Sequence, residues 1–99
     1  DVTNAFETLL LQLSFLYQSL TDGLSNSQIN FLEAVISGEE KFSSKEIIQT
    51  YNLGTSANVI RIKQALVSKE IIEVSGSNIE FLDPMYKHWL TKQYFKTRY

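Results

Sequence analysis

The chain has 99 residues, of which 43% are hydrophobic and 20% charged, and its net charge at pH 7 is -2. This length suits one domain, and the apolar content is too high for a disordered segment. The absence of cysteine excludes a disulfide scaffold, a thiolate metal site and a cysteine nucleophile. The apolar runs are too short to span a bilayer and no signal-peptide pattern opens the chain, so we expect a cytoplasmic domain without membrane contact, cut from a longer polypeptide.

Charge is distributed unevenly along the chain. Residues 1–40 carry six acidic residues and no Lys or Arg, whereas residues 41–99 hold nine basic residues against five acids, a local balance of +4. Only the second part would present a basic surface. A pI near 5.3 is low for an independent nucleic-acid binder.

An apolar stripe at the start of the chain predicts an amphipathic helix over about residues 2–20. The stripe consists of Val2, Phe6, Leu9, Leu13, Leu16, Tyr17 and Leu20. A Thr-Asp-Gly sequence at 21–23 ends it. We interpret residues 1–23 as a linker helix and residues 24–99 as the main domain.

The second helix has a complete set of start signals. Ser25 and Gln28 form a capping box, and Leu24 and Ile29 form a hydrophobic staple around it. Gly38 closes this helix. Its predicted buried face is Ile29, Leu32, Val35 and Ile36.

The same start signals repeat before a short third helix. Ser43 and Glu46 have the spacing of a capping box, with Phe42 and Ile47 as the staple. The helix is expected to end near residue 51.

A turn at Asn52-Leu53-Gly54 leads to the fourth helix. The glycine permits positive φ, and the leucine would plug the core between the two helices. Thr55 or Ser56 would cap a helix to about residue 69. Its predicted inward residues are Val59, Ile62 and Leu66.

Two β-branched or aromatic runs, 71–75 and 78–82, flank Gly76-Ser77, a two-residue loop that favours a type II′ hairpin. The predicted inner face of this hairpin is Ile72, Val74, Ile79 and Phe81. Asp83-Pro84 then gives an N-cap followed by proline at the first helical position. The last helix, about 84–95, would bury Met85, Trp89 and Leu90, with Tyr86 beside them.

This order of elements predicts a mainly α fold with a small β-hairpin, arranged as a winged helix-turn-helix with the hairpin as its wing. Residues typical of catalysis do not gather in the sequence. His88 has no neighbouring ligand partner, Glu39-Glu40 lies in a loop, and Gly54-Thr55-Ser56 lacks the lysine of a phosphate loop. We therefore expect a non-catalytic domain without a metal or cofactor of its own.

The outward face of helix 55–69 is where such a fold reads double-stranded DNA. Arg61 and Gln64 are types that pair with guanine and adenine edges, and Ser56 would hold a phosphate. The candidate DNA-binding residues, with the wing at 71–82, are Ser56, Asn58, Arg61, Lys63, Gln64 and Asn78. Further backbone contacts would come from Lys69, Lys87, Lys92, Lys96 and Arg98.

A protein-docking role is the alternative reading of the same surface. Glu73 and Glu80 on the wing would repel phosphate, and Ile60, Val67 and Tyr94 would form one apolar patch for a protein partner. The residues alone leave DNA binding and an intramolecular or protein–protein contact both open, because the fold does not decide function.

The stretches LGTSANVIRIKQALVSKEII (53–72) and FLDPMYKHWL (81–90) resemble the C-terminal winged-helix region of prokaryotic AAA-type ATPases, an archaeal-type family also found in Bacteroides-like bacteria. Asp83, Pro84, Tyr86 and Trp89 match that family's Asp-Pro-x-aromatic-x-x-Trp segment. The resemblance implies a parent chain whose missing N-terminal ATPase domain binds ATP and contacts this domain. Lys69 to Ile72 also resemble the end of MarR-like recognition helices, which implies a third reading, a regulator that forms a homodimer through residues 2–20.

Overall fold

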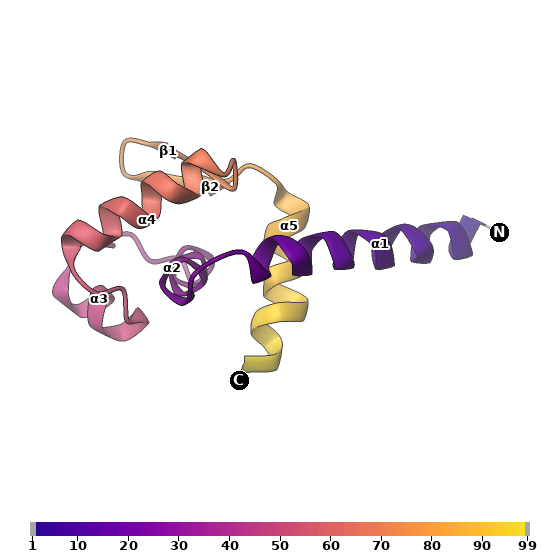
Figure 1. Ribbon diagram of the computed structural model, residues 1–99, viewed down its shortest axis with the longest axis horizontal. Coiled ribbons are helices and arrows are strands. Elements are labelled where there is room, and N and C mark those ends of the chain that lie inside the picture. The colour runs from indigo at the N-terminus through magenta and orange to yellow at the C-terminus, as the bar shows by residue number, and fades with distance from the viewer. Residues whose placement is uncertain (1, 99) are drawn as a thin grey trace.

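The computed structural model describes the backbone of residues 2–98 and the side chains of residue 5 and residues 7–96. Its elements are α1 (Val2–Asp22), α2 (Asn26–Ile36), α3 (Lys45–Tyr51), α4 (Ser56–Ser68), β1 (Ile72–Ser75), β2 (Asn78–Phe81) and α5 (Pro84–Trp89), which continues through a π-helical turn (Leu90–Tyr94) and a 3₁₀ turn (Phe95–Arg98). The molecule measures 51 × 28 × 22 Å. Its long axis arises because α1 extends past α5, away from the other elements (Figure 1). The predicted mainly helical fold with one antiparallel hairpin is confirmed.

The core lies where α2, α4, α5 and the base of the hairpin meet. Its most deeply buried side chains are Phe31, Leu32, Leu53, Val59, Leu66, Ile72, Tyr86 and Leu90. The predicted inward face of α4 (Val59, Ile62 and Leu66) is confirmed. These apolar side chains come from α2, the turn before α4, α4, β1 and α5 with its continuation, so the domain has one continuous core.

Helix α2 begins as the sequence predicts but buries a wider face. Ser25 caps it and forms the full capping box with Gln28. Phe31 and Ala34 are fully buried, whereas the predicted Val35 and Ile36 are only half-buried. The predicted buried face of α2 was too narrow because this helix packs against both α3 and α4. The centroids of the Phe31 and Phe42 rings lie 4.9 Å apart.

Helix α3 begins one residue later than the sequence pattern indicates. Its N-cap is Ser44, whose hydroxyl accepts a hydrogen bond of 3.3 Å from the Ile47 amide, so the predicted cap at Ser43 is wrong. A turn in which the Ser44 amide bonds the Lys41 carbonyl delays the helix start. Glu46 therefore occupies the second helical position and cannot close a capping box.

The turn between α3 and α4 follows the prediction. Asn52 and Gly54 adopt positive φ of 54° and 90°, and Leu53 between them is fully buried. Thr55, the first of the two expected caps, caps α4 through a bond from the Asn58 amide. The turn fixes the angle between the two helices by inserting the leucine into the core.

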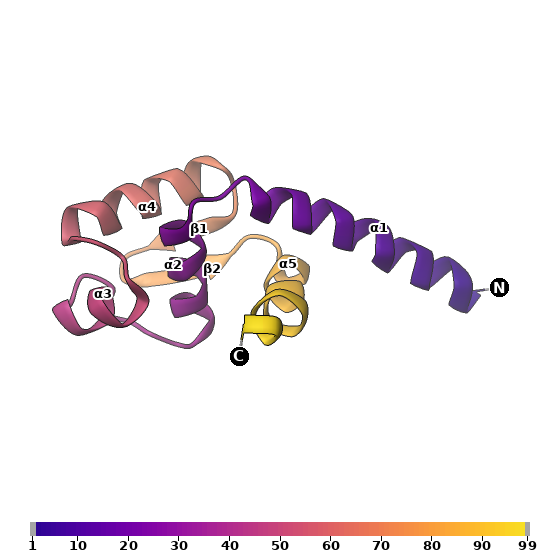
Figure 2. The ribbon, with the colours of Figure 1, turned by 60° about the horizontal axis from the view of Figure 1, so that its bottom comes forward.

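The hairpin has the predicted two-residue loop, with Gly76 at φ 62° and Glu73 directly opposite Glu80. Ile72 at its base is buried, but Val74 is 41% exposed, so the expectation that Val74 faces the core is wrong. The hairpin runs behind α2 and below α4 in Figure 2, so α4 lies along one side of it. Val74 lies on the predicted face of the strand, but it stays exposed because an open groove separates it from α4.

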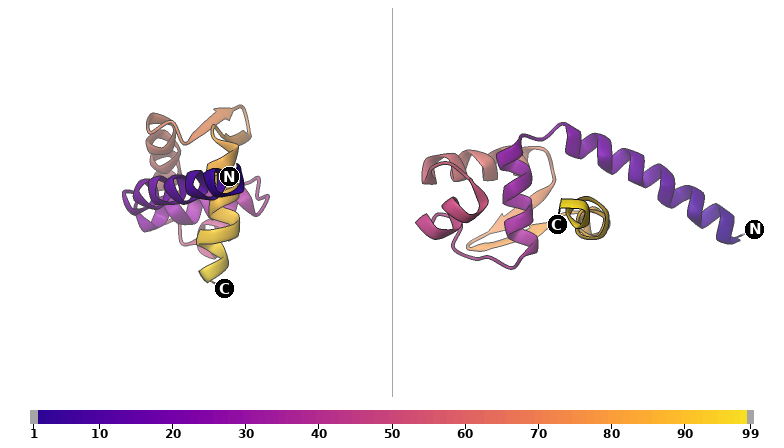
Figure 3. Two further views of the ribbon diagram at one scale, coloured as in Figure 1. Left: turned by 90° about the vertical axis from the view of Figure 1, so that its right-hand side faces the viewer. Right: turned by 90° about the horizontal axis from the view of Figure 1, so that it is seen from below.

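Helix α5 joins α1 to the rest of the fold. Asp83 caps it and Pro84 occupies its first position, as predicted. Tyr86, Trp89 and Leu90 are buried, but Met85 is 48% exposed, which corrects the expected inward face. In the right panel of Figure 3, α5 is seen end-on between α1 and the body formed by α2 and the hairpin.

Only the C-terminal half of α1 contacts this body. Ser14, Tyr17 and Thr21 bond to residues that begin or line α5. In the predicted stripe, Tyr17 is buried and Leu13 half-buried, but the remaining described residues Leu9, Leu16 and Leu20 are exposed. The side chains of Val2 and Phe6 lie outside the described residues. The contact face of α1 is therefore rotated from the predicted one.

Candidate functional site

The outer face of α4 displays three of the candidate DNA-binding residues. Ser56, Arg61 and Gln64 are exposed along the helix, and Asn78 is exposed on the wing at the first position of β2. None of these four side chains is buried. They lie on the face where a recognition helix and a wing would meet a duplex.

Asn58, in contrast, is part of the turn. Its side-chain amide Nδ2 donates a hydrogen bond of 2.7 Å to the Leu53 carbonyl, and its backbone amide donates to Thr55 Oγ1 at 3.1 Å. The side chain is half-buried. Asn58 was predicted as a candidate DNA-binding residue, and in the structure its side chain holds the backbone of the preceding turn.

Lys63 also points away from the outer face. Its ammonium nitrogen lies 5.9 Å from the centroid of the Phe42 ring, a cation–π distance, and the residue is half-buried. Lys63 is a candidate DNA-binding residue by type, but it packs on the loop before α3. Arg61 is therefore the exposed cation in the middle of α4.

An apolar groove runs between α4 and the wing. Ile60, Val67 and Val74 are 55%, 42% and 41% exposed, and they border a groove of about 420 Å³. The complete lining is Ile60, Lys63, Gln64, Val67, Ser68 and Val74. Sequence reasoning identified Ile60 and Val67 as a patch but missed Val74, since strand alternation assigns that valine to the core side.

Tyr94 does not belong to this groove. It is half-buried, and its ring lies 5.9 Å from the Trp89 ring and 5.4 Å from the Phe95 ring. The expected patch of Ile60, Val67 and Tyr94 is therefore wrong in its third member. Tyr94 belongs instead to the aromatic cluster along α5 and its continuation.

Acidic side chains lie on the face of the wing opposite Val74 and at the end of α4. Glu73 and Glu80 are paired across the hairpin and both are exposed. Glu70, with φ 60°, is exposed where α4 ends, next to the exposed Lys69. Because three carboxylates stand against Arg61 and Lys69, the face has a weak electrostatic attraction for phosphate.

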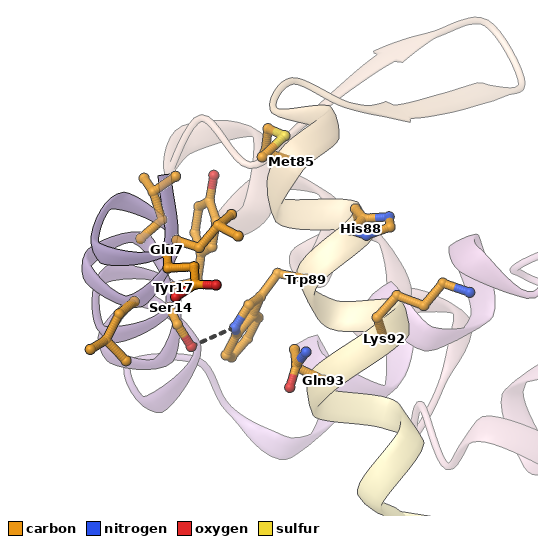
Figure 4. A pocket seen from close by; sticks show the side chains of 11 residues that line it. Glu7, Ser14, Tyr17, Met85, His88, Trp89, Lys92 and Gln93 are labelled. Atoms are coloured by element: carbon orange, nitrogen blue, oxygen red, sulfur yellow. Dashed lines mark hydrogen bonds between the residues drawn. The ribbon is translucent and has the colours of Figure 1, made fainter. Parts of the chain in front are cut away.

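A second hollow lies in the angle between α1 and α5, with a volume of about 380 Å³. Trp89 points from α5 towards α1 and donates a hydrogen bond of 3.0 Å to the Ser14 hydroxyl, whereas His88 and Lys92 point away from α1 (Figure 4). The polar side chains at its edge do not converge on a common point. The hollow is an angle between two helices and lacks the arrangement of a catalytic centre.

The described side chains include no group of three or more His, Asp or Glu residues that could hold a metal ion. Of the backbone-contact candidates, Lys69, Lys87, Lys92 and Lys96 are exposed, and the Arg98 side chain lies outside the described residues. Among the helices in the described range, none is long and apolar enough to cross a membrane.

Comparison with known proteins gives one result. Residues 15–92 match the family model described as a probable winged helix domain. Searches of curated proteins and of solved structures found no significant match. The matched range begins inside α1 and includes α2, α3, α4, the hairpin and α5, and the family description names a fold without an activity.

Proposed function

The chain belongs to the family described as a probable winged helix domain, and on this premise we propose that it is a non-catalytic module that binds protein through the groove between α4 and the wing. The observation that carries the proposal is the exposure of Ile60, Val67 and Val74 around one groove. A grouped apolar surface of this kind is typical of a protein contact. The acidic wing beside it favours a protein over a polyanion.

The occupant that we propose is an apolar segment of a neighbouring domain in the same polypeptide. The Asp-Pro-x-aromatic-x-x-Trp segment beginning at Asp83 supports a prokaryotic AAA-type ATPase as the parent protein. In that case ATP binds the neighbouring domain, and this module reports or limits the movement of that domain. The groove would then be covered in the parent protein and open in the 99-residue chain.

Double-stranded DNA is the second candidate ligand. The exposed positions of Ser56, Arg61 and Gln64 on one helix face support it. Glu70, in contrast, would weaken the approach of a phosphate backbone. A duplex bound here would have to rely on few cationic contacts and on base-edge hydrogen bonds from Arg61 and Gln64.

The test for DNA is fluorescence anisotropy of the 99-residue chain with a random duplex over a salt series. The protein-binding proposal expects no binding at low salt and tens of micromolar protein, a range in which non-specific DNA binders register. Salt-sensitive binding that is lost in an Arg61→Ala, Gln64→Ala double variant would establish the DNA candidate in its place. A Lys41→Ala variant, changed at an exposed lysine outside the candidate DNA-binding residues, is the matched control.

The test for the protein contact uses the purified natural polypeptide. A photo-cross-linking amino acid at Gln64, which is exposed and lines the groove, should cross-link to a segment outside residues 1–99. The same amino acid at Leu82, 47% exposed but outside the groove, should not. Equal cross-linking from both positions, or none from Gln64, would overturn the proposal.

A further inference from the structure

The apolar surface of α1 is larger than its contact with α5 requires. Among the described residues, six of the eleven exposed large hydrophobic side chains lie on this one helix. They are Leu9, Leu10, Leu11, Phe15, Leu16 and Leu20. The stability of a helix in a protein comes mainly from packing its apolar face against other elements. The first half of α1 therefore needs a partner beyond the rest of this chain.

The spacing of the apolar residues identifies the kind of partner. Six apolar residues of α1 recur at intervals of alternately four and three positions. They are Val2, Phe6, Leu9, Leu13, Leu16 and Leu20. A helix that packs on a globular core has a broader stripe with a period of 3.6 residues. A repeat of 3.5 residues keeps a narrow line of side chains facing another helix, which is the pattern of a coiled coil.

This line of residues, the α1 seam, is not the face that contacts α5. Tyr17, which is buried against α5, lies one position after the seam residue Leu16, and so about 100° further around the helix. On the seam itself Leu9, Leu16 and Leu20 are 51%, 62% and 37% exposed. Leu13 is half-buried and packs against the core at the edge of the contact. Helix α5 therefore covers one flank of the seam and leaves the seam open to a second helix.

The flanks of the seam carry no charge. In coiled coils the flanking positions usually hold charged side chains that select the partner and its orientation. Here one flank holds Ala5, Gln12 and Ser19, and the other includes Leu10 and Tyr17. The charged side chains of α1 are Glu7 and Asp22, both away from the seam. An identical helix therefore meets no like-charge repulsion, and it offers the same leucine-rich surface with the same period.

We propose that the α1 seam pairs with the α1 seam of a second copy of this chain to form a two-helix coiled coil. The pairing uses a different surface from the α4–wing groove, so it neither depends on the proposed function nor competes with it. With less than three heptads the association is weak, and we expect a Kd on the order of 10 µM.

Sedimentation velocity of the 99-residue chain over a wide concentration range tests this proposal. We expect a reversible monomer–dimer equilibrium. Leu16→Lys, which places a charge in the seam, should weaken dimerisation at least about tenfold, because charges are excluded from the core positions of a short coil. Leu11→Lys is the matched control, since Leu11 is 59% exposed against 62% for Leu16 but lies outside the seam.

Both substituted leucines are more than half exposed, so both variants should fold, and circular dichroism at a concentration where all three proteins are monomers verifies it. A dimer that survives Leu11→Lys and is lost in Leu16→Lys supports the seam. A wild-type chain that stays monomeric at about 500 µM, far above the expected Kd, would overturn the proposal. Equal weakening by both variants would also overturn it, because the association would then be non-specific.

Discussion

The Tyr17 hydroxyl donates a hydrogen bond of 2.8 Å to Oδ2 of Asp83, while Oδ1 of the same carboxylate accepts a bond of 2.9 Å from the Met85 amide. One side chain thus caps α5 and holds α1, although the two bonded residues are 66 positions apart. The N-cap sets the direction of α5, and the tyrosine bond sets the position of α1 against it. The angle between these two helices is therefore coupled to a single carboxylate.

Removing this carboxylate should destabilise the fold through both contacts. We expect Asp83→Ala to lower the free energy of unfolding by about 1–3 kcal/mol, from a lost helix cap and a lost charge-assisted bond. Asp83→Asn should cost less because its amide oxygen still caps α5. Urea unfolding measures the difference. Asp22→Ala, at an exposed aspartate whose carboxylate accepts a bond from the Gln18 side chain, is the control. An equal loss there would contradict the coupled role of Asp83.

Tyr17 should make the fold sensitive to alkaline pH. Burial, followed by the hydrogen bond and the negative charge of Asp83, raises the pKa of Tyr17 from 10.0 to about 12. Between these values the folded chain keeps a proton that the unfolded chain has lost, so this contribution is complete below pH 10 and disappears as the pH rises through about 12. The contribution is at most about 2–3 kcal/mol.

The comparison that tests this pH dependence is wild type against Tyr17→Phe, with urea unfolding at several pH values across that window. The variant should lose less stability with rising pH, although at neutral pH it is less stable by about 1 kcal/mol for the missing bond. Burial also raises the pKa of Tyr86, but Tyr86 is present in both proteins and does not contribute to the difference. If the free energy of unfolding of both proteins changes equally with pH, Tyr17 is not the source of the alkaline sensitivity.

A buried hydroxyl pair behind this contact gives a third prediction. Thr21 is fully buried, and its hydroxyl donates to the Tyr17 carbonyl at 2.7 Å, so the Tyr86 hydroxyl, also at 2.7 Å, must donate to Thr21. Thr21→Val leaves the Tyr86 hydroxyl without this acceptor and should cost about 1–3 kcal/mol. Adding Tyr86→Phe should recover part of the loss, because two apolar groups leave no polar atom unpaired. A double-mutant cycle measures the coupling, and strictly additive losses would show that the pair is not coupled.

The sequence predicted the order and type of the elements because their signals are local. Ser25 with Gln28 acts within one helical turn, and Gly76-Ser77 acts within one hairpin, so neither needs the rest of the fold to be recognised. Asp83-Pro84 starts α5 for the same reason. The spacing of Val59, Ile62 and Leu66 predicted the inward face of α4, because this helix has the core on one side only.

Features that depend on distant contacts could not be predicted. Ser43 and Ser44 are equivalent as caps until the preceding turn selects one of them. Val74 has the alternation of a core residue, and it is exposed because an open groove separates it from α4. In the candidate site, Asn58 has the residue type of a DNA-binding position, but its amide satisfies the Leu53 carbonyl. Tertiary geometry decided each of these cases.

The turn before α4 provides the last prediction, through two glycines with nearly the same backbone. Gly54 has φ 90° and Gly38 has φ 85°, but a Cβ at Gly54 would lie 3.2 Å from Asn58 Nδ2, whereas a Cβ at Gly38 would meet nothing within 4 Å. Both alanine variants should lose about 1–2 kcal/mol from left-handed backbone strain. Gly54→Ala should lose about 1 kcal/mol more, because Asn58 cannot withdraw without stretching its bond to Leu53.

Urea unfolding of the two alanine variants, each in the wild-type and in the Asn58→Ala background, separates the two contributions. Removing the asparagine side chain should abolish the extra loss at Gly54 and leave the loss at Gly38 unchanged, because only Gly54 contacts Asn58. If Gly54→Ala and Gly38→Ala lose equal stability in the wild-type background, the Asn58 side chain moves aside without a measurable cost. Its amide would then be available to a ligand, and the residue would return to the candidate DNA-binding surface beside Arg61 and Gln64.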